Sequence, residues 1–265
     1  MYSSYQLAFK YLNHFLSASN GKGHGIHSPF VFDFIKNVLN DKENHADFQK
    51  VENIRKELLK DGTLLTIEDY GAGSSSFSSS RRSVSSIARH AIKSKKYGQL
   101  LYRIVKYYRP KIIVELGTSL GVTTSYLSLA ARQADVITLE GATEIARLAR
   151  AKFETLGLKN IKLVEGNFDY TLPAVLHALP SVDLAFVDGN HRCDPTLNYF
   201  DWLLPKATND SIFIFDDIHW SGEMEQAWNV VCHHPSARCS VDLFFIGIIF
   251  FRQEFREKQH FIVRF

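Results

Sequence analysis

The sequence predicts an α/β protein with a doubly wound, mostly parallel sheet that is covered by helices on both faces. From Tyr97 onward, short apolar runs alternate with helical patterns, and this alternation is typical of a parallel sheet. The runs are almost entirely apolar, which indicates strands buried on both faces. Before Tyr97, helical patterns are separated by breaks rich in glycine and serine. We therefore expect a helical N-terminal extension over residues 1–96 and a sheet domain over residues 97–265.

The extension is expected to contain three helices, over Ser4–Phe15, Pro29–Leu39 and Asp47–Leu59. Proline is favourable at a first helical position, as at Pro29, and the third helix has its apolar residues at helical spacing. The glycine- and serine-rich stretches at residues 20–25 and 71–80 are predicted to be loops. We interpret the second loop as a linker or as a lid over a site in the sheet domain.

Five apolar runs indicate the sheet domain. We predict that they are parallel strands: Ile112–Leu116, Val136–Leu139, Ile161–Val164, Leu184–Val187 and Ile212–Phe215. Helices are expected between them at about residues 121–133, 143–156, 169–178 and 194–204.

The end of the sequence predicts one more helix and further strands. The helix is expected over Glu223–Val231. Ser240–Leu243 and Gly247–Phe251 lie close enough in sequence to form an antiparallel hairpin. His260–Phe265 is expected to add an edge strand.

A loop with two glycines follows the first predicted strand and reads Gly117-Thr118-Ser119-Leu120-Gly121. Glycine allows a tight turn and a close approach of the backbone to a ligand. Glu140 ends the second strand, nineteen residues after Gly121, and an acidic side chain there can accept hydrogen bonds from both ribose hydroxyls. The pair predicts an adenosine-containing ligand. Alternatively, Glu140 only caps the helix that follows it.

The loop favours S-adenosylmethionine over a nicotinamide dinucleotide. A dinucleotide loop has the pattern G-x-G-x-x-G and holds a pyrophosphate at a helix N-terminus. Here the two glycines, Gly117 and Gly121, are four residues apart and Glu115 precedes the first. A carboxylate near the ligand disfavours a pyrophosphate but suits the cationic methionine end of the methyl donor.

Three aspartates follow the fourth and fifth predicted strands, namely Asp188, Asp216 and Asp217. The carboxyl ends of neighbouring parallel strands meet at one edge of a sheet, and buried carboxylates without partners are costly. Oxygen ligands suit Mg²⁺ or a similar divalent cation, so we predict that these three hold one. In the alternative interpretation, Asp188 binds only the cofactor and Asp217 caps a helix.

The predicted cation gives the site a chemical role. It would bind an acceptor hydroxyl and lower the pKa of that hydroxyl. His191, three residues after Asp188, is a candidate general base for the same proton. It is otherwise a loop histidine without a role.

At these residues the sequence resembles the class I S-adenosylmethionine-dependent methyltransferases, which have a Rossmann-like fold. It is most similar to small-molecule O-methyltransferases related to the catechol and caffeoyl-coenzyme A enzymes and to bacterial sugar or antibiotic methylators. The resemblance covers about residues 97–252. The resemblance rests on the segments Val114–Gly121, Thr138–Gly141, Val164–Phe168, Phe186–His191 and Phe215–Trp220.

The resemblance implies roles for individual residues. Glu115, Gly117 and Ser119 would line the methionine part of the donor, Glu140 would hold the ribose, and Asn167 and Phe168 would lie beside the adenine. The complete set expected to bind the cofactor is Glu115, Gly117, Thr118, Ser119, Gly121, Glu140, Gly141, Asn167, Phe168 and Asp188. The predicted catalytic residues are His191 and Asp188.

Two departures from the family pattern concern the acceptor. Many catechol-type enzymes have Asp-Asn where this chain has Asp216-Asp217, and they commonly carry a lysine shortly after the position of Asp188. These differences put a catechol acceptor in doubt more than they do the metal.

Composition limits the partners. The net charge is only +3, and no aromatic residues interleave with the basic stretch from Arg81 to Lys96, so nucleic acid is not the favoured partner. No apolar run approaches the length of a membrane helix, and three cysteines without metal spacing suit the cytoplasm. The extension would either cover the acceptor pocket or form a homodimer interface.

The sequence therefore predicts metal-assisted O-methylation of a small hydroxylated molecule. The alternatives are a metal-independent methyltransferase that acts on another acceptor, including RNA, or a non-catalytic protein that retains the fold.

Overall fold

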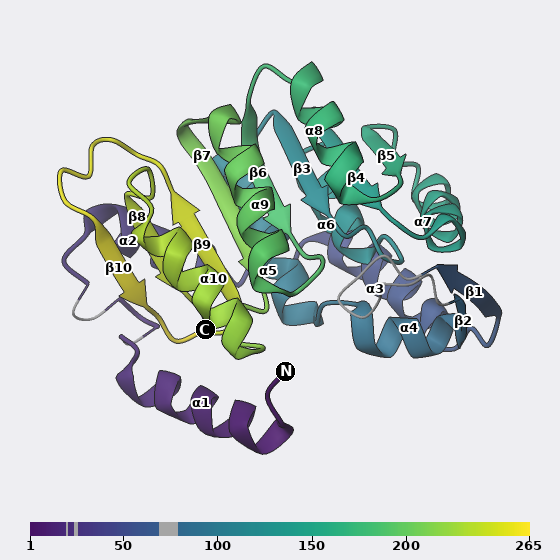
Figure 1. Cartoon of the computed structure of the whole chain (residues 1–265), viewed down its shortest axis with the longest axis horizontal. Coiled ribbons are helices and arrows are strands. Elements are labelled where there is room, and N and C mark those ends of the chain that lie inside the picture. Colours follow the sequence, from purple (N-terminus) through teal and green to yellow (C-terminus); the bar gives the residue numbers. More distant parts are fainter. Residues whose placement is uncertain (20, 24–25, 69–78) are drawn as a thin grey trace. The chain divides into compact units, whose positions relative to one another are not determined.

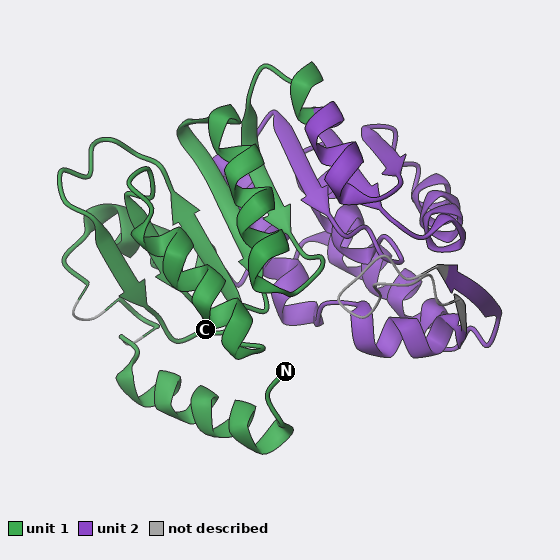
Figure 2. Ribbon diagram, viewed as in Figure 1, with its two compact units in different colours: residues 1–41, 176–265 green, residues 42–175 purple. Residues whose placement is uncertain are grey.

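The computed structural model of the chain describes residues 1–19, 21–23, 26–68 and 79–265. These residues form two compact units, one of residues 1–41 with 176–265 and one of residues 42–175 (Figure 2). The predicted loop over residues 71–80, which we interpreted as a linker or a lid, lies outside the described residues except for its last two residues. The predicted domain boundary near residue 96 stays a prediction.

The strands of the main sheet follow the order β10-β8-β9-β7-β6 in the unit of residues 1–41 with 176–265 and the order β3-β4-β5 in the unit of residues 42–175 (Figure 1). Helices are interspersed with the strands along the chain. The predicted α/β fold with a mostly parallel, Rossmann-like sheet is confirmed.

In the unit of residues 42–175, the sheet strands are β3 (Ile112–Leu116), β4 (Asp135–Glu140) and β5 (Ile161–Glu165). β4 lies between β3 and β5 and is parallel to both. Four of the five residues of β3 are buried, because helices cover both faces of a parallel sheet.

The helices of this unit carry a continuous apolar core. They are α3 (Ala46–Leu58), α4 (Val84–Ala91), α5 (Lys95–Tyr108), α6 (Val122–Ala130), α7 (Thr143–Thr155) and most of α8 (Phe168–Ala178). The predicted third helix is confirmed as α3, whose residues at helical spacing, among them Val51 and Ile54, are buried together with Tyr126 of α6.

A two-stranded antiparallel sheet was not predicted. It pairs β1 (Leu64–Glu68) with β2 (Ser79–Ser83). The sequence of β2 is Ser-Ser-Arg-Arg-Ser, which lacks the apolar alternation of a half-buried strand. Arg81 and Arg82 are exposed in this strand.

In the other unit, β6 (Val182–Val187) and β7 (Ala207–Asp216) are parallel. β9 (Ile246–Phe250) runs antiparallel to β7 and to β8 (Cys239–Asp242), which confirms the predicted hairpin. The edge strand is β10 (Gln259–Ile262), parallel to β8.

The helices of this unit are α1 (Ser4–Ser17), α2 (Pro29–Phe34), α9 (Cys193–Leu203) and α10 (Gly222–His233). A π-helical turn over Ile35–Leu39 extends α2, and a 3₁₀ turn over Leu204–Lys206 follows α9. Within the described part of the chain, none of the helices is long and apolar enough to cross a membrane.

Gly247 lies where β9 packs against α10. A Cβ atom at Gly247 would stand 2.6 Å from two ring atoms of Trp228, which is itself buried. Gly247→Ala should therefore lower the free energy of unfolding by about 1–3 kcal/mol, as expected for overpacking. Urea unfolding followed by tryptophan fluorescence measures this loss.

Gly62→Ala is the matched control, because a Cβ atom there would meet nothing within 4 Å. Equal unfolding free energies for the two variants would show that the ring of Trp228 moves away without cost.

Candidate functional site

Glu140, at the end of β4, organises the loop that follows β3. Its Oε2 accepts a hydrogen bond from the backbone N–H of Ser119 at 2.8 Å, and its Oε1 accepts one from Ala142 at 3.0 Å. Burial raises the pKa of the carboxyl group, and backbone N–H donors oppose this rise. Each oxygen retains a further lone pair, so the carboxylate can still accept bonds from a ligand's hydroxyl groups. Glu140 thus supports the helix start, as in the alternative interpretation, and holds the loop as well.

The loop between β3 and α6 needs left-handed backbone at three positions. The φ angles are +97° at Gly117, +48° at Ser119 and +78° at Gly121. At Gly121 a Cβ atom would also lie 2.6 Å from the Phe153 ring. Backbone conformation therefore favours glycine at both positions, and at Gly121 the Phe153 ring also leaves no space for a side chain. Ser119 is held in a sparsely populated conformation by its hydrogen bond to Glu140.

Glu115, the fourth residue of β3, is completely buried. Its Oε2 accepts hydrogen bonds from the hydroxyl groups of Thr124 at 2.5 Å and of Thr138 at 2.7 Å. The hydroxyl of Thr118 lies 2.6 Å from that of Thr138. Because Thr138 donates its single proton to Glu115, Thr118 must be the donor in this second contact. The predicted residues Glu115 and Thr118 therefore belong to one network.

Burial raises the pKa of Glu115 to about 7, although the two threonine hydroxyls act in the opposite direction. The Oε1 atom of Glu115 and the Oγ atom of Ser119 are buried without hydrogen-bond partners among the described residues. A buried polar atom without a partner costs free energy, and these two atoms come from the predicted donor loop and the residue before it. Their chemistry fits the cationic methionine end of S-adenosylmethionine, for which a carboxylate and a hydroxyl are suitable partners.

The predicted adenine-side residues lie at the start of α8, after β5. The side-chain oxygen of Asn167 accepts a hydrogen bond from the N–H of Asp169 at 2.8 Å, and its backbone carbonyl accepts one from Thr171. Asn167 therefore supports the first turn of α8, and Phe168 begins that helix. Gly141 directly follows Glu140 in the chain. Contacts of these residues with adenine stay predictions.

In the unit that contains β6 and β7, the structure brings Asp188, His191 and Asp216 together. One ligand atom from each lies within 4.8 Å of the other two, and the Nε2 atom of His191 is 3.6 Å from Oδ1 of Asp188. Asp216 is 1% exposed, whereas Asp188 and His191 are partly accessible. Two carboxylates and an imidazole form a donor set that fits a divalent cation.

Asp217 was predicted as the third ligand, but it is not among the three residues that the structure groups in this described region. Its backbone has a φ of +52°, its N–H donates to the carbonyl of Phe245 at 2.7 Å, and its own carbonyl accepts from Trp220. Its role as a ligand stays a prediction, as does the predicted contact of Asp188 with the cofactor.

Sequence reasoning missed Thr124 and Thr138, which hold Glu115. Threonines are common on apolar strands and on buried helices, so their presence does not point to a partner for Glu115. The one useful signal was the position of Thr138 on the strand that pairs with β3, because Glu115 and Thr138 are register partners. His191 was predicted as a base, and its proximity to Asp216 was not foreseen.

Comparison with known proteins identifies the region that carries these residues. Residues 114–218 match a family described as a methyltransferase domain. A methyltransferase from Podospora anserina with bound S-adenosylhomocysteine has a similar structure, with 15% sequence identity and a TM-score of 0.60 over 85% of this chain and 97% of that one.

Two O-methyltransferases are also similar in structure. One, from Bacillus cereus with S-adenosylhomocysteine, has 16% identity and a TM-score of 0.56 over 83% of this chain and 97% of its own. The other, from Streptomyces achromogenes, is involved in tomaymycin synthesis and holds S-adenosylmethionine; it has 15% identity and a TM-score of 0.55 over 83% of this chain and 96% of its own. No curated protein matches the chain.

Glu115 should make stability depend on pH. Because its pKa rises from 4.5 to about 7 on folding, the native state binds this proton more tightly than the unfolded chain does. The contribution favours folding below about pH 4.5 and is lost as the pH rises through 7. As the pH rises from 5 to 8, the stability of Glu115→Gln relative to the wild type should therefore increase by on the order of 1–3 kcal/mol. Urea unfolding at each pH measures this difference.

The exposed Glu154 provides the control, since Glu154→Gln should keep the pH profile of the wild type. If Glu115→Gln also follows the wild-type profile, Glu115 is ionised in the native state throughout this range.

Proposed function

We propose that the chain, whose residues 114–218 match a methyltransferase domain, is an S-adenosylmethionine-dependent enzyme that methylates a hydroxyl group of a small molecule with the help of a divalent cation. The observation that carries the proposal is the pairing of Glu140 with the strained loop after β3. Two further facts support it: solved O-methyltransferases share the fold, and Asp188, His191 and Asp216 lie together.

The donor would be bound by residues of the unit 42–175. Glu140 is held by backbone N–H groups with its carboxylate ready to accept from ribose hydroxyls. The Oε1 atom of Glu115 and the Oγ atom of Ser119, which have no hydrogen-bond partner among the described residues, would receive the methionine end. A cationic ligand beside Glu115 would favour the ionised carboxylate and lower its pKa from about 7. Donor binding and release of a proton from Glu115 are then linked.

The cation would be held by Asp188, Asp216 and His191. When bound, a divalent cation lowers the pKa of an acceptor hydroxyl and fixes its position. The burial of Asp216 favours this assignment, because a buried carboxylate is stabilised by a positive charge beside it. The partial exposure of Asp188 and His191 leaves them accessible to an incoming ion.

An imidazole among the ligands would change which metal is preferred. Carboxylate oxygens suit Mg²⁺ and Mn²⁺, whereas imidazole favours later transition metals. We therefore expect Co²⁺ to bind more tightly than the Mg²⁺ predicted from the three aspartates alone. The second candidate role of His191 is the general base predicted from sequence, and its 3.6 Å distance from Asp188 suits that role as well, because the carboxylate would stabilise the imidazolium.

Donor binding can be tested at Glu140. Glu140→Gln leaves only one acceptor oxygen for the loop and the ribose together, so its affinity for S-adenosylhomocysteine should fall by about tenfold or more. Isothermal titration calorimetry measures the dissociation constant. Glu57→Gln, which changes an exposed glutamate paired with Lys152, should bind as the wild type does. If the wild type shows no saturable binding, the assignment of the donor fails.

Cation binding can be tested without activity. Co²⁺ should raise the melting temperature and give a visible absorption band, and it should bind at least about tenfold more tightly than Mg²⁺. His191→Ala should abolish the preference for Co²⁺, while His177→Ala, on an exposed position of α8, should leave it unchanged.

If His191 is the base, His191→Ala will bind Co²⁺ as the wild type does, but methyl transfer will be slower and its pH dependence will change. If the wild type binds neither metal and a chelator leaves activity unchanged, the proposed metal assistance is wrong.

A further inference from the structure

Helix α1 turns polar side chains toward the rest of its unit. The Lys10 ammonium lies 3.0 Å from both carboxylate oxygens of Glu225 on α10, and the Tyr2 hydroxyl donates to the same carboxylate at 2.8 Å. Four residues after Lys10, the Nε2 atom of His14 lies 3.1 Å from Oδ1 of Asp242 on β8. Lys10 and His14 of α1, together with Tyr2 just before the helix, therefore attach this segment to its unit through hydrogen bonds and ion pairs.

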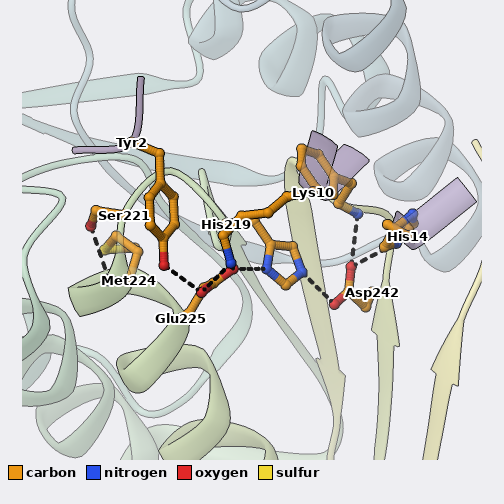
Figure 3. A network of polar contacts seen from close by, with 9 residues as sticks. Tyr2, Lys10, His14, His219, Ser221, Met224, Glu225 and Asp242 are labelled. Carbon is orange, nitrogen blue, oxygen red and sulfur yellow. Dashed lines mark hydrogen bonds and ion pairs between the residues drawn. The ribbon is translucent and has the colours of Figure 1, made fainter. Parts of the chain in front are cut away.

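His219 joins the two attachment points (Figure 3). Its Nδ1 atom lies 3.0 Å from Glu225 and its Nε2 atom 2.8 Å from Asp242. Burial disfavours the ionised form of Asp242, but hydrogen bonds from His14 and His219 outweigh it and hold the pKa of Asp242 well below its usual range. The inner face of α1 thus rests on a connected polar network, with Tyr11 packed edge-on against Phe244 beside it.

The outer face of α1 is apolar. Tyr5 is 90% exposed, Phe9 64%, Leu12 51% and Leu16 67%. None of the fourteen residues of α1 is buried. An isolated helix of this length is only marginally stable in water, and a stripe of large exposed apolar residues marks an interaction surface. We call these four residues the α1 stripe.

We propose that the α1 stripe is the contact through which two copies of this chain form a dimer, with their α1 helices antiparallel. The spacings along the stripe are four, three and four residues, which is the heptad pattern of a helix that packs against another helix. The pattern reads the same from either end. A two-fold axis between Phe9 and Leu12 therefore places Tyr5 opposite Leu16 of the second copy, and Phe9 opposite Leu12.

The exposed area suits a reversible dimer. A large aromatic side chain carries about 150–250 Å², so the stripe offers on the order of 500 Å² per copy. Two copies would bury about 1,000 Å², close to the lower limit of specific interfaces. We expect a dissociation constant in the micromolar range.

Charge favours a second copy over a lipid surface. Helices that lie on membranes carry lysine and arginine on the face opposite their apolar one. The only lysine or arginine of α1 is Lys10, and it is paired with Glu225. Two α1 stripes brought together would therefore meet no like charges from the helices themselves.

Sedimentation velocity of the full chain from about 1 to 200 µM tests the proposal, because the wild type should shift from monomer to dimer over this range. Leu16→Glu would place a carboxylate opposite Tyr5 of the second copy, and it should raise the dissociation constant at least about tenfold. Leu64→Glu is the matched control: Leu64 is 64% exposed in β1, and its replacement should leave the dissociation constant unchanged.

Circular dichroism at 1 µM checks that both variants keep the helical content of the wild type. A second pair of variants tests the antiparallel arrangement. A mixture of Phe9→Cys and Leu12→Cys chains should form the mixed disulfide in preference to either symmetric one.

A wild type that stays monomeric up to 200 µM would overturn the proposal, and so would a dimer that Leu16→Glu leaves intact. Wild-type chain that sediments with vesicles of phosphatidylserine and phosphatidylcholine, without dimerising, would assign the stripe to a lipid surface and would overturn it too. None of these outcomes bears on donor or cation binding.

Discussion

A carboxylate that is completely enclosed in protein fixes the geometry on which the donor loop depends. Glu115 lies on β3 with no exposed surface, and three threonine hydroxyls connect it to the neighbouring elements. Thr138 belongs to β4, Thr124 to α6 and Thr118 to the loop between β3 and α6. The loop is therefore held by Thr118, through the hydroxyl of Thr138, and by Glu140, through the N–H of Ser119. Its unusual backbone angles persist because both anchors determine them.

The two glutamates of this region have different tasks because their surroundings differ. Glu140 receives backbone N–H donors on both oxygens, which favours its ionised form against the effect of burial. Glu115 receives two hydroxyl donors on one oxygen and none from described residues on the other, and its pKa rises to about 7. One carboxylate is thus suited to organise a loop, whereas the other is suited to respond to a charged ligand.

The parallel sheet could be predicted from the sequence because its strands are short apolar runs whose hydrophobicity alone requires burial on both faces. The glycines could be predicted because the tight turn after the strand restricts the residues that fit there. Glu140 could be predicted because it stands at the end of a strand. The hairpin of β1 and β2 could not, since the β2 sequence Ser79–Ser83 has the polarity of a loop. Strand order along the sheet is decided by tertiary contacts, so a sequence pattern does not reveal it.

Side-chain grouping at the candidate cation site was only partly predictable. Asp188 and Asp216 end neighbouring parallel strands, and this topology alone brings their carboxylates to one edge. Whether His191 or Asp217 completes the group depends on the path of the backbone after each strand. Asp217 has a left-handed conformation with its N–H bonded to Phe245, and no pattern in the sequence announces that turn.

The unit of residues 1–41 and 176–265 is discontinuous in sequence, and this affects the order in which the chain folds during synthesis. Residues 42–175 are contiguous in sequence, so the contacts within this unit can form once that stretch has emerged. The partners of residues 1–41 lie beyond residue 175, and Tyr2 must wait for Glu225, 223 positions later. Helix α1, with its apolar side uncovered, is therefore synthesised long before the partners on which it docks. During that interval it is a natural client for chaperones that shield hydrophobic segments of nascent chains.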